Sequence, residues 1–353
     1  MAERSPKAPL LGDYFMARRK TKRTFLDDID ALIDWRPILS FLNKKLTRKA
    51  DAVGNPAYPA LAMFKILLLQ RWYNLSDPAT EQALYDRLSF IRFVGLSFEG
   101  DVPDETTICR FRNGLIKLNI LDKVLDRINE QLEAKGLLVR EGTVVDASVV
   151  ESSRRPRKII DILPEDRAEE AEQPPTSTAK SDCSVKVSFS DDADAAWLKK
   201  GRCSHYGYKI HAAPASTGAR DGFFLGGHAT SANRSDMREF ETLLDEIHVV
   251  PGTYVYGDKG YSSGANRDAL LARGLKDATM DKATRRAPLT AYERLRNRLI
   301  SSVRCGVERV FGTWKRGYGL ARARYLGLKK VCAELYLVGM AFNLKKAVLL
   351  MRT

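Results

Sequence analysis

The sequence predicts an α+β protein in which an all-helical N-terminal region, residues 1–140, precedes a mixed-sheet domain, residues 141–353. Two changes in the hydrophobic pattern indicate this division. Between residues 58 and 135, apolar side chains recur at the three-to-four-residue spacing of helices. Beyond Gly136 the apolar residues become nearly continuous and β-branched, as in buried strands, and alternating segments follow. The longest helical patterns return only near the C-terminus, so strands and helices are largely grouped along the chain.

The charge of the chain points to a polyanionic partner. Its 353 residues are 44% hydrophobic, which is enough for a sizeable core, and they carry a formal net charge of +14. A surplus of this size is typical of proteins that bind nucleic acid. A basic surface without a specific partner is the alternative reading, because charge alone says little about function.

Cysteine usage and hydropathy predict a cytoplasmic protein without membrane association. The five cysteines are scattered and form no C-x-x-C pair, which is typical of a reducing compartment. The N-terminus lacks the apolar core of a signal peptide, and no apolar run reaches the roughly 18 residues of a membrane helix.

The helical region contains a succession of helices and turns that is typical of DNA-binding proteins. A helix with a broad apolar face begins near Tyr58, and a second helix is expected over residues 80–94. After a turn, Asp104 is a good N-cap for a third helix that carries Arg110 and Arg112. This helix–turn–helix pattern predicts that both arginines contact DNA. Exposed arginines on an ordinary bundle helix remain the alternative.

The second region begins with a strand over residues 143–150. Residues 151–182 are rich in Glu, Pro, Ser and Thr and predict an exposed, flexible insertion. A hairpin over 206–212 and 222–230, a helix over 236–248 and a strand ending at Asp258 come next. The order strand, strand, strand, helix, strand matches a mixed sheet of the ribonuclease H type. A final helix, residues 331–350, is expected to pack against this sheet.

A long helix over residues 291–316 gives the clearest periodic signal. One apolar stripe is predicted, and its members are Leu295, Leu299, Val303, Val307, Val310, Phe311 and Trp314. An adjacent polar face carries Asn297, Ser301, Arg304, Glu308 and Lys315.

Three carboxylates are candidates for one metal site. Asp146 lies inside a β-branched run, where an unpaired carboxylate is costly to bury, so it requires a partner. Asp258 ends a second strand, and Glu308 lies on the long helix. Carboxylate oxygens are the ligands that magnesium and manganese prefer, and phosphodiester cleavage with two such ions needs ligands of this kind.

Each carboxylate also has a simpler reading. Ser148 and Glu151 fit a capping box, which would make Asp146 a residue before a helix. Asp258 stands in a good turn sequence. Glu308 is spaced for a surface ion pair with Arg304.

Three ordered motifs resemble those of bacterial insertion-sequence DDE transposases, specifically the family numbered five. They are Val144-Val-Asp-Ala-Ser148, Tyr254-Val-Tyr-Gly-Asp-Lys-Gly-Tyr-Ser262 and Arg304-Cys-Gly-Val-Glu-Arg-Val-Phe-Gly-Thr-Trp-Lys315. The segments Tyr58-Pro-Ala-Leu-Ala-Met-Phe-Lys65 and Pro103-Asp-Glu-Thr-Thr-Ile-Cys-Arg-Phe-Arg112 resemble the helical region of that family. The third motif often begins with a tyrosine, where this chain has Ser301.

The resemblance implies a ribonuclease H-like catalytic domain in which Asp146, Asp258 and Glu308 are the catalytic metal ligands. It implies Mg²⁺ as cofactor, with Mn²⁺ substituting, and double-stranded transposon ends and target DNA as partners. Metal-activated water would cleave the ends, and the freed 3′-hydroxyls would join target DNA. The cations Lys259, Arg304 and Lys315 would offset phosphate charge.

Pairing two DNA ends implies a homodimer or a larger assembly. No Gly-rich phosphate loop is present, so no nucleotide cofactor is expected. Two other functions stay open: a metal-dependent nuclease that cuts without joining, and a non-catalytic DNA-binding regulator derived from a transposase.

Overall fold

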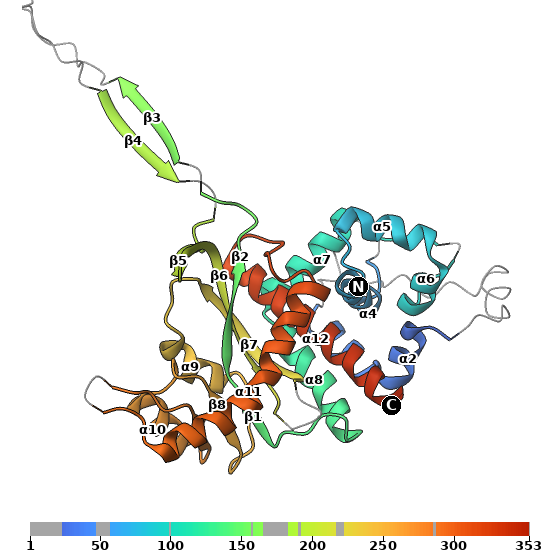
Figure 1. Cartoon of the computed structure of the whole chain (residues 1–353). Helices are drawn as coiled ribbons and strands as arrows, with labels where there is room; N and C mark the ends of the chain where they lie inside the picture. The colour runs from blue at the N-terminus through green and yellow to red at the C-terminus, as the bar shows by residue number, and fades with distance from the viewer. Residues whose placement is uncertain are drawn as a thin grey trace, which may run out of the picture.

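The computed structural model describes residues 23–46, 57–98, 100–156, 158–164, 183–189, 192–216, 222–284 and 287–352. A helical part and a sheet-containing part lie side by side, and the last helix joins them (Figure 1). The predicted α+β class is therefore confirmed. No helix in these segments is both long enough and apolar enough to cross a bilayer.

Seven helices of the described chain precede the sheet. They are α2 (Phe25–Leu32), α3 (Arg36–Lys45), α4 (Ala60–Trp72), α5 (Asp77–Asp86), α6 (Leu88–Val94), α7 (Glu105–Leu118) and α8 (Leu121–Ala134). The helix α4 is buried on nearly every side, and Asp104 caps α7 as predicted. The predicted helix over 80–94 is divided at Arg87, whose backbone is extended and whose guanidinium lies over the rings of Tyr73 and Phe90.

The sheet has a parallel and an antiparallel part. The parallel strands are, in spatial order, β1 (Gly142–Val144), β8 (Tyr254–Gly257) and β9 (Lys276–Thr279). In the antiparallel part, β6 (Cys203–Pro214) pairs with β2 (Asp146–Glu151), β5 (Ala196–Lys200) and β7 (Phe224–Ser231). Val145 joins the parts, because its N–H donates to the carbonyl oxygen of Tyr256 at 2.8 Å. The predicted mixed sheet is confirmed, but the single predicted strand over 143–150 is divided at Val145.

Four helices accompany the strands: α9 (Asp236–Asp245), α10 (Gly264–Ala272), α11 (Ala291–Gly317) and α12 (Leu328–Arg352). As predicted, α12 packs against the sheet, where the ring of Phe224 on β7 lies over Gly339. A Cβ at Gly339 would stand 2.1 Å from that ring, so only glycine permits this contact.

The last helix also packs against α2, α4 and α8, so one hydrophobic core runs through both parts of the molecule. A buried ion pair between Arg71 on α4 and Glu334 on α12, 2.8 Å long, crosses the same contact.

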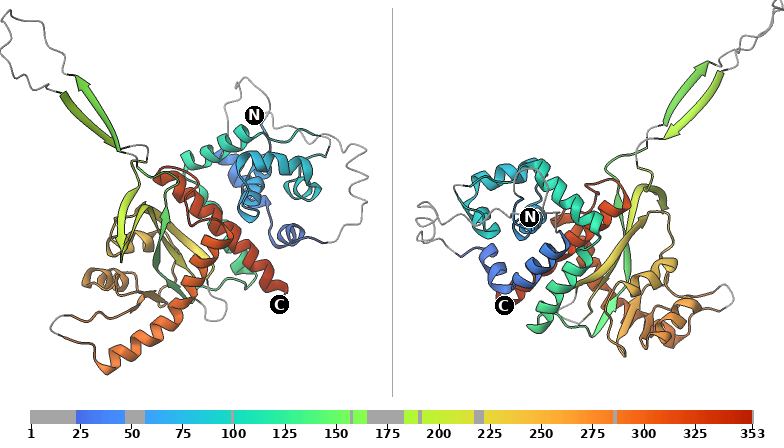
Figure 2. Two further views of the ribbon diagram at one scale, coloured as in Figure 1. Left: turned by 45° about the horizontal axis from the view of Figure 1, so that its top comes forward. Right: turned by 180° about the vertical axis from the view of Figure 1, so that it is seen from behind.

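The predicted flexible insertion over 151–182 contains regular structure. The strands β3 (Lys158–Pro164) and β4 (Cys183–Phe189) pair in antiparallel fashion and extend away from the body (Figure 2). The segment 165–182 lies outside the described residues. The capping-box reading of Ser148 and Glu151 is wrong, because both residues belong to β2.

The predicted apolar stripe of α11 is buried only in the second half of the helix. Val307, Val310, Phe311 and Trp314 are buried, whereas Leu295 and Leu299 are 54% and 62% exposed. The first half of α11 projects past the sheet edge (Figure 2). It is attached there through polar side chains, which is why the pattern of apolar residues did not predict its orientation.

Candidate active site

Asp146 lies where the chain passes from the parallel to the antiparallel part of the sheet. Its side chain is 18% exposed. The N–H of Ala147 donates to Oδ1 at 2.8 Å, and Nη2 of Arg304 donates to Oδ2 at 3.2 Å. The partner that the sequence required for Asp146 is therefore, in this structure, the guanidinium of Arg304 on α11.

Asp258 follows β8, the strand beside β1, so the two aspartates come from neighbouring strands at one edge of the sheet. The N–H of Gly260 donates to Oδ1 of Asp258 at 2.7 Å. A Cβ at residue 260 would stand 2.9 Å from the same oxygen, so a larger residue there would displace the carboxylate of Asp258. Asp258 thus stands in a turn, and the turn holds its carboxylate at the sheet edge.

Burial dominates the environment of the Asp146 carboxyl. Burial is the largest influence on Asp146 and raises the pKa of its carboxyl; the nearby charge of Asp258 raises it further, and Arg304 opposes both. The positive charge of Arg304 does not offset these effects, because the pKa of Asp146 remains above its ordinary value. A further cation between the two aspartates would favour the charged form of Asp146.

Tyr261 is a further residue of the site, and the sequence reasoning did not single it out. Its side chain is 1% exposed, and its hydroxyl has no hydrogen-bond partner among the described residues. Burial raises the pKa of Tyr261 well above its usual value, and the charges of Asp146, Asp236 and Asp258 add to this. The available signal was its place in the turn, three residues after Asp258.

The helix α11 is positioned by contacts to the end of β9. Nη1 of Arg296 donates to the carbonyl oxygen of Thr279 at 2.7 Å and to Oδ2 of Asp281 at 2.8 Å. Asn297, which is buried, accepts from the N–H of Asp281 and donates to its carbonyl oxygen. Arg304 follows two turns later, so these contacts set its position above the aspartates.

Glu308 lies one turn beyond Arg304 on α11, and its side chain is exposed. In the described part of the chain, no three His, Cys, Asp or Glu side chains are close enough to hold a metal ion together. The structure thus brings Asp146, Asp258 and Arg304 together but leaves the predicted set of three carboxylates open.

The residues present nevertheless fit a hard divalent cation. Asp146 and Asp258 carry carboxylate oxygens, which such a cation prefers, at the ends of neighbouring parts of the sheet. Two buried donors without acceptors, the hydroxyl of Tyr261 and Nε of Arg304, accompany the aspartates and suit an oxygen-rich group such as phosphate.

The predicted DNA-contact residues are placed differently. Lys259 is exposed beside Asp258, and Arg110 is exposed on α7. Lys315 is half-buried; burial lowers the pKa of its ammonium, as does the charge of Lys200, while Glu151 opposes them.

Arg112 is a correction to the sequence prediction. It is 3% exposed, and both Nη atoms donate to the carboxylate of Asp77 at 2.7 Å. Its guanidinium also lies 4.6 Å from the ring centroid of Tyr325. Arg112 is a structural residue that joins α5, α7 and the loop before α12, and its side chain is not at the surface to contact DNA.

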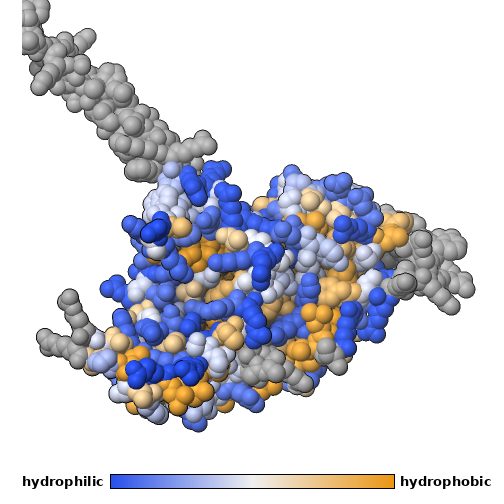
Figure 3. Space-filling model, in the orientation of Figure 1, coloured by the Kyte–Doolittle hydropathy of each residue, from blue (hydrophilic) through white to orange (hydrophobic). Residues whose placement is uncertain are grey.

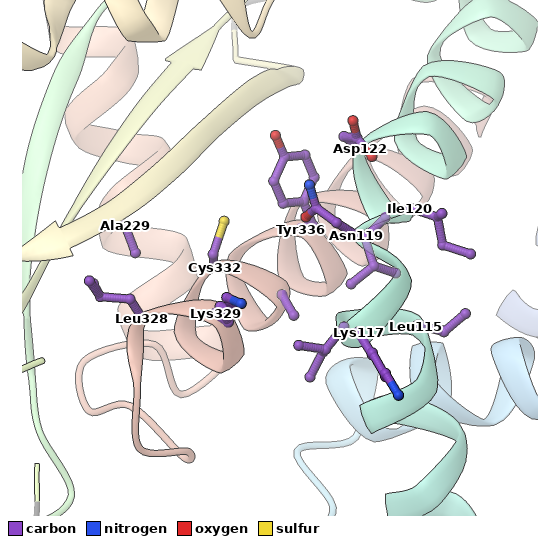
Figure 4. A pocket seen from close by; sticks show the side chains of 13 residues that line it. Leu115, Lys117, Asn119, Ile120, Asp122, Ala229, Leu328, Lys329, Cys332 and Tyr336 are labelled. Carbon is purple, nitrogen blue, oxygen red and sulfur yellow. The ribbon is translucent and has the colours of Figure 1, made fainter.

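The hollow in Figure 4 is separate from the aspartates. Its volume is about 390 Å³, and it lies between the junction of α7 and α8, β7 and the start of α12. Lys117, Asp122, Cys332 and Tyr336 are among its lining residues, and none of the three candidate carboxylates is. The candidate site is therefore an open edge of the sheet and not this hollow.

Comparisons with known proteins identify the family of the chain. A family model described as "Transposase DDE domain" matches residues 138–344, and one described as "Transposase domain (DUF772)" matches residues 14–114. The transposase for insertion sequence element IS1106 of Neisseria meningitidis serogroup B is 36% identical over 241 residues, which cover 67% of this chain and 76% of that protein.

Two solved structures were also found. They are a pre-cleavage Mos1 transpososome, 10% identical, and a Mos1 transposase paired-end complex with the left transposon end, 9% identical. They cover 84% and 87% of this chain and 98% and 95% of their own chains, each with a TM-score of 0.20, too low to support an argument about the fold. The DDE-domain model alone spans more than half of the sequence. The chain therefore belongs to the bacterial insertion-sequence transposases with a DDE domain, as the resemblance predicted.

Proposed function

We propose that this transposase binds the inverted-repeat ends of its insertion sequence, cleaves phosphodiester bonds there and joins the 3′-hydroxyl ends to target DNA. The observation that carries the proposal is the pair formed by Asp146 and Asp258, which stand on neighbouring strands with Arg304 above them. A basic chain of net charge +14 suits a substrate of this kind.

The catalytic part is proposed to be a ribonuclease H-like domain formed by residues 141–353. The order of elements along the chain supports this: three antiparallel strands, a helix and two further parallel strands. In space the strands lie in the order β7, β6, β2 with β1, β8 and β9. In such a sheet the first and fourth strands are neighbours, which accounts for the closeness of Asp146 and Asp258.

Asp146, Asp258 and Glu308 are proposed to hold Mg²⁺, for which Mn²⁺ would substitute. The bound ions would supply an activated water and stabilise the leaving oxygen. For Glu308 to take part, α11 or its side chains must shift, because the three carboxylates are not yet close together. Arg304, Lys259 and Lys315 are the cations on this side that would offset the charge of the DNA backbone.

The helical region, residues 1–140, is proposed to bind the transposon ends through surface cations such as Arg110. Two ends must be paired, so the active assembly is proposed to contain at least two copies of the chain. It would act on DNA in the bacterial cytoplasm.

The test is a cleavage assay with Asp146→Asn on duplexes that contain the inverted repeats flanking the gene. We expect strand cleavage in Mg²⁺ to be lost while end binding, measured by mobility shift, is kept. Undiminished cleavage by this variant would refute the proposed role of Asp146.

The open arrangement of the three carboxylates also favours a second candidate, a non-catalytic DNA-binding regulator. A regulator would bind the ends but nick no DNA in Mg²⁺ or Mn²⁺. A nuclease without joining activity would release cut ends and give no strand-transfer product, so one assay that resolves both products separates the three functions.

A further inference from the structure

A second hollow lies between the helices α11 and α12, away from the aspartates. Its volume is about 370 Å³, and its lining residues come from the second half of α11, the second half of α12 and the end of α4. In Figure 1 these helices face the viewer at the junction of the two parts of the molecule. Hydrophilic and apolar residues alternate over this junction in Figure 3.

Three cations line this groove, and no carboxylate does. Arg309 stands on the α11 side, and Lys345 and Lys346 stand on the α12 side. Within the described residues, the exposed side chains of Arg309 and Lys345 form no ion pair or hydrogen bond. Lys346 lies with Nζ 5.4 Å from the ring centroid of Phe223. The groove is therefore positively charged from both sides.

The shape of the groove suits a chain of phosphates. On α11 its wall is low, because Gly306, Thr313 and Gly317 present small side chains or none. Rings of Trp72 and Tyr318 contribute to the lining. A narrow polyanionic backbone can thus approach the helix closely while cations on both sides contact it.

The groove lies on a different side of α11 from the candidate active site. Arg309 directly follows Glu308, and successive helical residues point about 100° apart. Arg304, Glu308 and Lys315 share one face, whereas Gly306, Thr313 and Gly317 share another. DNA bound at the sheet edge would therefore pass around one side of α11 to reach the groove.

We propose that the α11–α12 groove binds the sugar–phosphate backbone of the DNA that flanks the cleaved bond. The inference rests on the proposed function for its setting, but it concerns binding alone and can hold even if cleavage does not occur. A second copy of the chain, whose formal net charge is +14, would bring further positive charge to the groove, whereas a phosphate backbone is complementary to it.

The test is the salt dependence of DNA affinity for the full-length chain. The probe is a mixed-sequence duplex of about 30 base pairs, since phosphate contacts are independent of sequence, titrated from about 50 to 200 mM salt in EDTA. The variant carries Arg309→Gln, Lys345→Gln and Lys346→Gln together. We expect its slope of log affinity against log salt to be shallower by about 2 to 3, because each lost phosphate contact removes about 0.9.

A matched control carries Arg238→Gln, Lys329→Gln and Lys330→Gln, which remove the same charge at exposed positions outside the groove and outside residues 1–140. Its slope should change by less than about one contact. A second variant, Thr313→Trp, fills the groove without changing its charge and should also weaken DNA binding. Equal slopes for the two triple variants would overturn the proposal.

Other outcomes are equally decisive. If the groove variants change the oligomeric state in sedimentation but leave the salt slope as it was, the groove is an interface between copies and the proposal is wrong. All binding is measured in the Asp146→Asn background, so loss of cleavage, or its absence in the parent, does not affect the result.

Discussion

Arg304 on α11 donates from Nη2 to Oδ2 of Asp146 at 3.2 Å, and this bond links the long helix to the first carboxylate of the sheet edge. The two side chains are only 14% and 18% exposed. The guanidinium therefore takes one of the oxygens that a metal ion would need. In the proposed function this contact couples metal binding to DNA binding, because a phosphate that attracts Arg304 would free Asp146.

Replacing Arg304 by glutamine should separate these two effects. Without the cation, Mn²⁺ should bind the DNA-free protein about tenfold tighter or more, because a largely buried charge pair at this distance contributes at least about 1.4 kcal/mol. Cleavage of end-containing DNA should fall, since the phosphate loses a cation. Calorimetry in the absence of DNA measures the first effect. Arg298→Gln, an exposed change on the same helix, is the control, and weaker Mn²⁺ binding by Arg304→Gln would contradict the coupling.

Asp146 should lower the stability of the metal-free protein at neutral pH. The pKa of its carboxyl is raised above the ordinary 3.8, so the folded chain holds the proton more tightly than the unfolded chain. Stability conferred by this group is therefore present in acid and falls as pH rises from about 3.8 through the raised pKa. Asp146→Asn should melt at a higher temperature than the parent at neutral pH in EDTA, and the difference should vanish below the ordinary pKa. A lower melting temperature at pH 7 would show that Arg304 stabilises the charged carboxylate more than burial opposes it.

Local patterns in the sequence predicted much of the fold. The N-cap at Asp104 needs only the residues around it, and the buried α4 follows from a continuous apolar face. The division of the strand at Val145 depends on which strands lie on either side, and no local pattern contains that information.

Prediction of the site from local sequence patterns was limited in the same way. The sequence pattern predicted Asp146 within one strand and Asp258 at the end of another, but the exposed state of Glu308 depends on how α11 sits. That helix is fixed by Asn297, a polar residue outside the predicted apolar stripe. Arg112 was misassigned for a related reason, since its partner Asp77 lies 35 residues away and only the fold brings the two together.

Tyr261→Phe should stabilise the DNA-free protein while reducing cleavage. The buried hydroxyl has no partner among the described residues, and an unsatisfied polar group of this kind costs about 1–3 kcal/mol, so its removal should raise the free energy of unfolding. In the active complex the hydroxyl would donate to a phosphate oxygen, so cleavage should decrease. Urea denaturation and single-turnover cleavage measure the two effects.

The control for Tyr261 is Tyr208→Phe. The hydroxyl of Tyr208 is equally buried but donates to Asp192 and accepts from the N–H of Gly327, so its loss should lower stability by about 1–3 kcal/mol. If both variants lose stability alike, the hydroxyl of Tyr261 has a partner in solution, and its proposed role toward phosphate fails.

Arg110 and Arg112 should respond in opposite ways to the same substitution. Arg112→Gln leaves Asp77 without its buried partner, and removal of one member of such a pair costs about 3–5 kcal/mol. Arg110→Gln should leave the free energy of unfolding within about 0.5 kcal/mol of the parent, as at an exposed site, and weaken DNA binding through loss of one phosphate contact. Urea denaturation and a salt titration of duplex affinity, both performed at a temperature where Arg112→Gln remains folded, check the pair. A stable Arg112→Gln with a reduced salt slope would restore Arg112 as a DNA contact and would require α7 to expose it in solution.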